Sequence, residues 1–272
     1  MNNDLKQLAK KLGFKAMSAN WETYCHQSWV EQLLKEEEIE RARLSLERRK
    51  QEANIGEFKP MADFDWDWPE EIDRELVEEL LTLRFLDEKG VNLAFVGGNG
   101  IGKTMIVQNI AYGALATGLR TRFVQASQML YELSRQDSDI ALNRCLKKYC
   151  NYDLLVIDEL GSLDYGKRYA DLLFAVVSGR YLKRSTIVTT NTIFQEWNTI
   201  FPTAMCVTTL VDKLMHRSEL IVIKGKSYRE KEAIERAQAR SKRRKEKNTK
   251  PAIEERANTK KTRKESDGKE TK

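Results

Sequence analysis

The sequence predicts an α/β fold in which helices flank a parallel β-sheet, with a small helical module before the sheet and a disordered basic tail after it. Short apolar runs typical of buried strands alternate with segments of helical periodicity over much of the 272 residues. A glycine-rich loop follows one of these runs, and two carboxylates end another. Strands connected by helices in this way pair in parallel, with the helices covering both faces of the sheet.

Each element of the predicted sheet domain rests on a local pattern. An apolar run leads into the glycine-rich loop, and helical periodicity resumes directly after that loop. Runs rich in β-branched and aromatic residues mark the later strands. The predicted strands span residues 92–96, 121–124, 154–157 and 186–190, and the predicted helices span 72–86, 105–115, 127–133 and 169–181.

The glycine-rich loop at residues 97–104, GGNGIGKT, is a full match to the phosphate-binding pattern G-x-x-x-x-G-K-[ST]. Its glycines let backbone N–H groups turn toward phosphate oxygens, its lysine can bridge the β and γ phosphates, and its hydroxyl can ligate Mg²⁺. The loop lies between a predicted strand and a predicted helix, as a P-loop requires. The chain is therefore expected to bind ATP through Gly97, Gly98, Asn99, Gly100, Ile101, Gly102, Lys103, Thr104 and Met105.

Two carboxylates end the buried run at residues 154–159, LLVIDE, which is the arrangement of a Walker B strand. Asp158 is expected to hold Mg²⁺ together with Thr104, and Glu159 to orient or deprotonate the attacking water. Asn191 follows the next predicted strand at the same carboxyl edge, where parallel sheets bind ligands. It is either a hydrogen-bond partner of the water or the γ-phosphate, or an asparagine that turns the chain.

The first part of the chain, residues 1–60, has the pattern of a separate helical module that binds DNA or a partner. Leucines at helical spacing precede Gly13, which favours a stop, and a second helix is expected to begin near residues 18–20. Residues 36–51 hold few large apolar side chains and several arginines among glutamates. That stretch is either a solvated helix with i,i+4 ion pairs or a face that binds nucleic acid or a partner.

The stretch after this module is predicted to be a linker, because glycine and proline punctuate it. It contains the sequence FDWDW at residues 64–68, whose three aromatic side chains are costly to leave in water. Some of them are therefore expected to dock on the sheet domain. The sequence leaves open whether Trp66 or Trp68 senses the nucleotide or packs against a helix.

Composition argues against several classes of protein. The four cysteines and two histidines include no C-x-x-C and no paired ligand spacing, which argues against structural zinc and disulfides. No apolar run approaches the roughly 18 residues of a membrane span, and the first residues lack a basic region followed by an apolar core. A cytoplasmic protein with no membrane partner is expected.

The net charge of +6 arises at the end of the chain. Residues 240–272 hold 14 Lys/Arg and 6 Asp/Glu, a net charge of +8. Because this segment has almost no large apolar side chains, residues 236–272 are predicted to be a disordered basic tail. The tail is either an electrostatic arm for nucleic acid or a solvated end without a dedicated partner.

Taken together, the motifs resemble the IstB family. GGNGIGKT, LLVIDELG, TTN and VDKLMHRSELIVIKGKSYR are similar to that family's ATPase motifs, and ERRKQEA with DFDW resembles its upstream segment. The resemblance covers about residues 1–230. IstB-like proteins are ATP-dependent transposition helpers of bacterial insertion sequences, related to DnaC-type helicase loaders in the AAA+ class. The resemblance implies an AAA+ P-loop NTPase core over residues 61–235.

The resemblance also implies roles that spacing alone does not. Asn191 matches sensor 1, and Arg229 matches the residue that reads the γ-phosphate as sensor 2. The family's arginine finger is replaced here by Lys213, and loss of a finger can cost about 10³- to 10⁵-fold in turnover. Arg217, four residues further on and expected on the same helical face, is either a substitute finger or a surface salt-bridge residue.

The function implied is that of an ATP-dependent helper, a slow and DNA-stimulated ATPase. It would assemble as a nucleotide-dependent homo-oligomer on double-stranded DNA and recruit or activate a transposase. Two alternatives stay open: a DnaC-like loader of a replicative helicase, and a non-hydrolysing DNA-binding module stabilised by ATP. The basic residues expected to line the DNA are Arg135, Arg144, Lys147, Lys148, Lys167 and Arg168.

Overall fold

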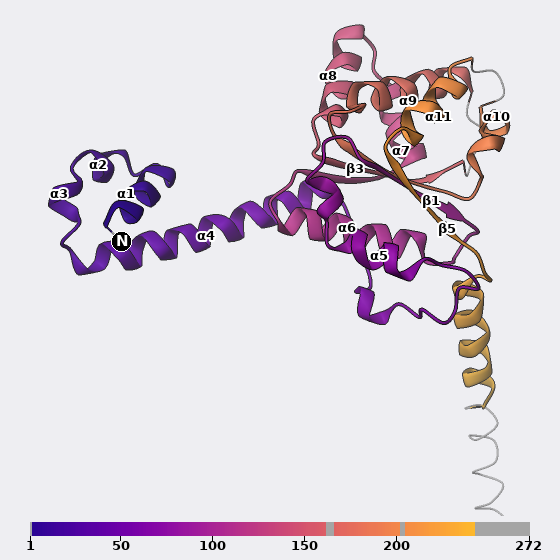
Figure 1. The fold of residues 1–272 in the computed structure, drawn as a ribbon, viewed down its shortest axis with the longest axis horizontal. Helices are drawn as coiled ribbons and strands as arrows, with labels where there is room; N and C mark the ends of the chain where they lie inside the picture. Colours follow the sequence, from indigo (N-terminus) through magenta and orange to yellow (C-terminus); the bar gives the residue numbers. More distant parts are fainter. Residues whose placement is uncertain (1, 162–165, 202–204, 243–272) are drawn as a thin grey trace, which may run out of the picture.

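A parallel sheet of five strands, in the order β2-β3-β4-β1-β5, forms the centre of the computed structural model (Figure 1). The structure describes residues 2–161, 166–201 and 205–242. The strands are β1 Asn92–Gly97, β2 Thr121–Gln125, β3 Leu154–Leu160, β4 Ser185–Thr190 and β5 Ser218–Ile223. The predicted parallel sheet is confirmed, and β5 is an edge strand that we had not assigned.

Helices cover both faces of this sheet, as the alternation of elements predicted. Because successive strand residues point to opposite faces, Leu154 and Val156 of β3 join one hydrophobic cluster, and Leu155 and Ile157 join the other. The first cluster lies under α5 and α6, and the second lies under α7, α8, α9 and α11. The helices are α5 Arg74–Leu81, α6 Lys103–Ala116, α7 Ala126–Ser134, α8 Asp139–Cys150, α9 Lys167–Arg180, α10 Trp197–Ile200 and α11 Val207–Met215. Short 3₁₀ turns, η1 Met61–Asp63, η2 Arg84–Leu86 and η3 Phe194–Glu196, lie between them.

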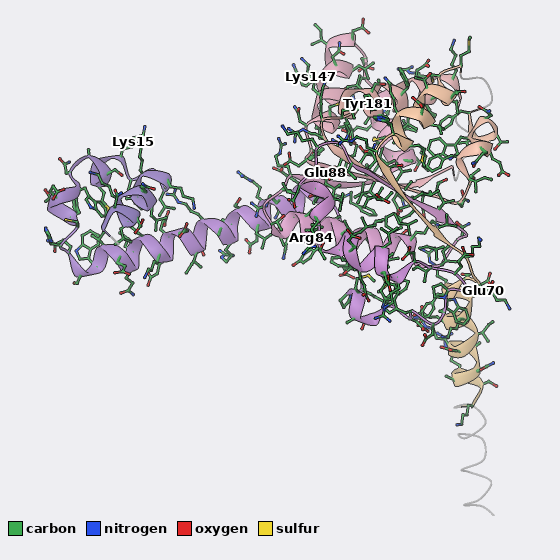
Figure 2. All side chains as sticks on the ribbon, in the orientation of Figure 1. Lys15, Glu70, Arg84, Glu88, Lys147 and Tyr181 are labelled. Carbon is green, nitrogen blue, oxygen red and sulfur yellow. The ribbon has the colours of Figure 1, made fainter. Side chains whose placement is uncertain are left out.

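The N-terminal module contains three short helices and the start of a long one. Its helices are α1 Asn2–Lys11, α2 Lys15–Ala19, α3 Trp21–Tyr24 and α4 Ser28–Ala53. A helix begins close to residues 18–20, as predicted, but it is the third, α3, with Asn20 at its N-cap position, because α2 precedes it and ends where the Asn20 side-chain amide donates to the Ala16 carbonyl at 3.2 Å. The end of α4 packs on α6 and β2, so the helices around Lys15 lie away from the sheet (Figures 1 and 2).

The helix predicted over residues 72–86 is shorter than expected. Asp73 caps its start by accepting a hydrogen bond from the Leu76 N–H at 2.9 Å. The helix ends after Leu81 because Leu83 adopts a left-handed conformation, with φ 67°. In that conformation the Leu83 side chain packs against Gly113 of α6. Tertiary packing therefore outweighs the amphipathic pattern at this point.

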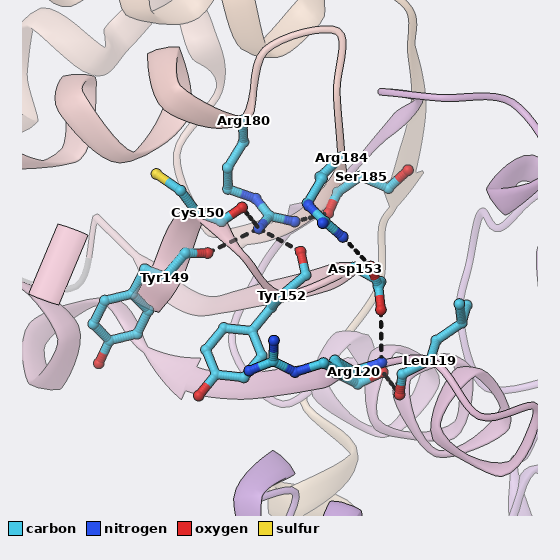
Figure 3. A network of polar contacts seen from close by, with 10 residues as sticks. Leu119, Arg120, Tyr149, Cys150, Tyr152, Asp153, Arg180, Arg184 and Ser185 are labelled. Atoms are coloured by element: carbon cyan, nitrogen blue, oxygen red, sulfur yellow. Dashed lines mark hydrogen bonds and ion pairs between the residues drawn. The ribbon is translucent and has the colours of Figure 1, made fainter. Parts of the chain in front are cut away.

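Arg180, at the end of α9, is a charged side chain inside the core and is only 1% exposed. Its guanidinium donates to the carbonyls of Tyr149 and Tyr152 at 2.8 and 2.7 Å (Figure 3), and to the hydroxyl of Thr186 at 3.0 Å. It also donates to the Ser185 carbonyl. These acceptors come from the end of α8, the turn before β3 and the start of β4. Arg180 therefore joins three segments at the amino edge of the sheet.

A further helix follows β5 over residues 228–242. Residues 236–242, which we had assigned to the disordered tail, are therefore helical in the structure. The remainder of the predicted tail, residues 243–272, lies outside the described residues. The N-terminus of this helix is next to the glycine-rich loop, because the Tyr228 N–H donates to the Gly100 carbonyl at 2.9 Å.

Candidate nucleotide-binding site

The glycine-rich loop leaves the end of β1 and enters α6, and neighbouring side chains press against two of its glycines. Gly100 has φ 74°, and a Cβ added there would come within 2.3 Å of the Ser227 hydroxyl. Gly102 has φ 103°, and a Cβ there would come within 2.6 Å of the Phe64 ring. Glycine is therefore required at both positions for conformation and for space.

The Lys103 side chain is buried within this loop. Its ammonium donates to the carbonyls of Gly97 and Gly98 at 2.7 and 2.6 Å. Burial lowers the pKa of Lys103 below its ordinary value, while the carboxylates of Asp158 and Glu159 act in the opposite direction. The ammonium thus lies among the loop carbonyls with little water around it, which strengthens its attraction for a phosphate anion.

Asp158, at the end of β3, is 3% exposed and lies against two hydroxyl groups. Thr104 donates to its carboxylate at 3.2 Å, and Thr189 donates to the other carboxylate oxygen at 2.5 Å. A carboxylate facing a threonine hydroxyl fits Mg²⁺, a hard cation that takes oxygen ligands and completes its shell with phosphates and water. In the described ranges, no cluster of three or more His, Cys, Asp or Glu could hold a metal by itself. The nucleotide would have to supply the remaining ligands.

Glu159 leaves the sheet at a β-bulge. The register between β3 and β4 shifts between Ile157 and Leu160, and Glu159 adopts φ 58°. As a result its side chain is exposed while that of Asp158 stays buried. The two adjacent carboxylates therefore face different environments, one suited to a cation and the other accessible to water.

Thr189 links these two residues, and we did not predict it. Its hydroxyl donates to the Asp158 carboxylate and accepts from the Glu159 N–H at 2.9 Å. The parallel register pairs Ile157 with Val188, which sets Thr189 beside Asp158. A sequence signal existed in the TTN motif, but choosing this threonine required the strand register.

A cavity of about 510 Å³ lies beside the loop, within the size range of small-molecule sites. One wall is the segment from Glu57 to Pro69, and another is the start of the helix over residues 228–242. The expected docking of aromatic residues occurs here. Phe64 and Trp68 line the cavity, whereas Trp66 packs against Phe64 with ring centroids 4.8 Å apart. Trp68 is held by its indole N–H, which donates to the Lys226 carbonyl at 2.8 Å.

The two predicted phosphate sensors occupy different environments. Arg229 lines the cavity beside Gly100 and Gly102. Asn191 lies just beyond β4 and is exposed, and its side-chain oxygen accepts from the Thr192 hydroxyl at 3.2 Å. Near the end of β4, the residue that contacts Asp158 is Thr189.

The expectation that Arg217 shares a helical face with Lys213 is wrong. α11 ends at Met215, and Arg217 adopts φ 58° in the turn before β5. Its guanidinium lies 3.7 Å from the Glu88 carboxylate. Because the Asn92 N–H at the start of β1 donates to the Arg217 carbonyl, this turn is at the amino edge of the sheet, opposite the glycine-rich loop. Arg217 is therefore remote from the glycine-rich loop of its own chain.

Lys213 makes contacts within its own chain. Its ammonium donates to the Ser178 hydroxyl at 2.9 Å and lies 4.7 Å from the centroid of the Phe174 ring. Both partners belong to α9. These contacts give Lys213 a packing role between α9 and α11.

Known proteins are similar to this chain over most of its length, beyond the nucleotide-binding site. The family model described as IstB-like ATP binding protein matches residues 2–236. The chain belongs to this IstB-like family. A protein of insertion sequence IS5376 from Geobacillus stearothermophilus is 31% identical over 228 residues, which cover 84% of this chain and 90% of that protein. A protein of insertion sequence IS21 from Pseudomonas aeruginosa is 29% identical over 239 residues, covering 85% and 90%.

Among solved structures, the IstB-like chain is similar to the replication initiator DnaA bound to AMPPCP and single-stranded DNA. The TM-score is 0.50 at 19% identity, over 60% of this chain and 49% of that chain. This likeness shows the shared fold, and the predicted architecture, a parallel sheet flanked by helices with a glycine-rich loop after a strand, is confirmed. Within the described residues, we find no helix with both the length and the apolarity needed to cross a bilayer.

Proposed function

We propose that this IstB-like protein is a DNA-stimulated ATPase that assembles on duplex DNA and recruits or activates the transposase of its insertion sequence. The observation that carries the proposal is the arrangement of Asp158 and Glu159 beside the glycine-rich loop. One carboxylate is buried against Thr104, and the next is exposed at a bulge. The association of the relatives with insertion sequences supports the transposition role.

In the proposed reaction, water attacks the γ-phosphorus of ATP and the bond to the β–γ bridging oxygen breaks. The loop N–H groups and Lys103 hold the β and γ phosphates. Thr104 and Asp158 would hold Mg²⁺, which supplies charge neutralisation for the phosphates. The Glu159 carboxylate orients the water and accepts its proton, giving ADP and inorganic phosphate. Thr189 positions both carboxylate residues through its hydroxyl.

The two predicted sensors would report the nucleotide state. Arg229 would contact the γ-phosphate, and Asn191 the attacking water, as sensors. Arg217 would act on the site of a neighbouring subunit, which would make hydrolysis depend on assembly.

The module over residues 1–60 would bind the partner protein or DNA, outside the ATPase core over residues 61–235.

Duplex DNA would contact the basic residues of α7, α8 and α9. Arg144 and Lys147 are exposed on α8, and Lys147 lies at the periphery of the core (Figure 2). Arg168, at the start of α9, donates to the Ser134 carbonyl at the end of α7 at 2.6 Å, which brings Arg168 near Arg135. Lys167 is exposed next to Arg168, while Lys148 forms an ion pair with Glu132. Phosphate contacts of this kind bind DNA with little base specificity.

A second candidate function is an ATP-stabilised DNA-binding module that does not hydrolyse ATP. The contacts of Lys213 with Ser178 and Phe174 favour it, because a lysine engaged in its own subunit does not supply an arginine finger. ATP hydrolysis measured with and without duplex DNA, together with light scattering, separates the two functions. Stimulated turnover with a nucleotide-dependent multimer supports the ATPase, and tight ATP binding without turnover supports the module.

Replacing Lys103 with Ala is expected to weaken ATP binding by about 10²- to 10³-fold. Removing a desolvated charge that contacts phosphate costs about 3–4 kcal/mol, and each 1.4 kcal/mol is roughly tenfold in affinity. Titration with a fluorescent ATP analogue measures the change. Lys35→Ala is the control, because Lys35 is an exposed lysine paired with Glu31 on α4. Unchanged affinity in Lys103→Ala would rule out the glycine-rich loop as the ATP site.

A further inference from the structure

A basic cleft of about 360 Å³ lies where α4 crosses the amino end of β2, away from the nucleotide cavity. The four α4 residues that line it fall at positions i, i+3, i+4 and i+7 and so lie on one helical face. Across from them is the turn that leads into β2. The lining residues are Ser45, Arg48, Arg49 and Glu52 of α4, with Gly118 and Arg120 of the turn.

The charges in this cleft are not balanced. Three arginines and one glutamate line it, a net charge of +2, and Arg122 follows two residues after Arg120 on β2. In the part of the chain that the structure describes, none of these arginines pairs with a carboxylate. Earlier on the same helix the opposite holds, since Arg43 pairs with both Glu40 and Glu47 at 2.6 Å. Along α4, the ion-paired arginine therefore gives way to unpaired ones where the cleft begins.

Neutral groups hold three of these arginines in position. Arg49 donates to the Ser45 hydroxyl at 2.7 Å, and the Arg120 guanidinium lies 5.6 Å from the centroid of the Tyr152 ring. Figure 3 shows this guanidinium beside Tyr152. Arg122 donates to the Glu52 carbonyl at 2.8 Å, and its Nε is buried without an acceptor among the described residues. These contacts fix the side chains but leave their charges unneutralised, so an anion in the cleft would relieve their mutual repulsion.

We propose that this cleft is a second contact for the phosphate backbone of duplex DNA. The inference rests on the proposed function, since it adds a contact to the DNA that the assembly binds. A guanidinium group forms two parallel hydrogen bonds with phosphate oxygens. A cluster of several unpaired arginines is better matched by a polyanion, with many phosphates, than by a ligand with a single carboxylate. The cleft residues of α4 lie toward the end of this helix that meets the core (Figure 1), and none of the cleft residues lines the nucleotide cavity, so DNA can reach the cleft without entering that cavity.

The test is the salt dependence of duplex binding by the full chain in the presence of ATP. Arg48→Gln and Arg120→Gln each remove one exposed charge from the cleft. The slope of log K against log salt is expected to fall by about 0.9 in each single variant and by about 1.8 in the double variant. Arg43→Gln is the matched control, because it removes an arginine of the same helix that is already paired with two glutamates. Its slope should equal that of the wild type.

Binding of a fluorescent ATP analogue and the unfolding temperature show whether each variant retains the fold. If Arg120→Gln unfolds at a lower temperature because its contact with Tyr152 is lost, the salt dependence of Arg48→Gln alone tests the inference. Unchanged slopes in the variants, with the wild type binding DNA, overturn this inference and leave the proposed function standing. Failure of the wild type to bind DNA overturns both. Loss of transposase binding with an unchanged DNA slope assigns the cleft to an acidic protein and overturns the DNA contact.

Discussion

Replacing Glu159 with Gln is expected to lower ATP turnover by about 10²- to 10⁴-fold while leaving ATP affinity nearly unchanged. Glutamine has the shape of glutamate and can still form hydrogen bonds, but it cannot accept the proton of the attacking water. The bulge that exposes this side chain depends on the backbone and on Thr189, so the local geometry should persist. Single-turnover hydrolysis and titration with an ATP analogue measure the two quantities separately, and light scattering should detect a persistent ATP-bound multimer.

The matched control is Glu219→Gln, which removes an exposed carboxylate from β5. Its turnover should equal that of the wild type. Thr189→Val should show an intermediate loss, because the hydroxyl that joins Asp158 and Glu159 disappears while the β-branched shape remains. Full turnover in Glu159→Gln would show that another group activates the water.

Arg180→Met is expected to lower the free energy of unfolding by about 3–5 kcal/mol. The carbonyls of Tyr149, Tyr152 and Ser185 would lose their donor inside the core. A buried acceptor without a partner costs roughly 1–3 kcal/mol, and breaking a buried charged network as a whole costs about 3–5 kcal/mol. Urea denaturation followed by circular dichroism measures the change, and the denaturant slope shows whether unfolding stays cooperative.

Arg184→Met is the control for this effect. Arg184 lies beside Arg180 and pairs with Asp153, but both side chains are about one-third exposed. A partly exposed ion pair contributes only about 0–1 kcal/mol, since solvent screens the two charges. A cost below about 1 kcal/mol for Arg180→Met would mean that water satisfies the three carbonyls, and that Arg180 does not hold the amino edge of the sheet.

The features that could be predicted from sequence are those encoded over short distances. The apolar runs specified four strands, and the glycine-rich loop with the carboxylates after β3 identified the nucleotide site. α8 and β5 were not assigned from the sequence, although four of the six residues of β5 are apolar and α8 also carries apolar residues, because their burial does not follow a simple pattern: Leu220 and Val222 of β5 and Ile140 of α8 are exposed. β5 gains stability from β1, a strand that is distant in the chain, which a local pattern does not record.

Other features depend on tertiary contacts, and the local sequence alone does not determine them. Leu83, Glu159 and Arg217 adopt positive φ angles that are typical of glycine, and each one changes an expected outcome. They shorten α5, expose a carboxylate and remove Arg217 from α11. The selection of Thr189 beside Asp158 depends in the same way on strand register.

The contact between Gly100 and Ser227 has an evolutionary consequence. The phosphate-binding pattern leaves position 100 free, yet in this chain a side chain there would collide with the Ser227 hydroxyl. In addition to its φ of 74°, position 100 is therefore constrained by a residue more than a hundred positions away, just before the helix over residues 228–242. Among homologues, these two positions should covary: a larger residue at 100 requires that the last helix begin further from the loop, with a correspondingly wider nucleotide cavity.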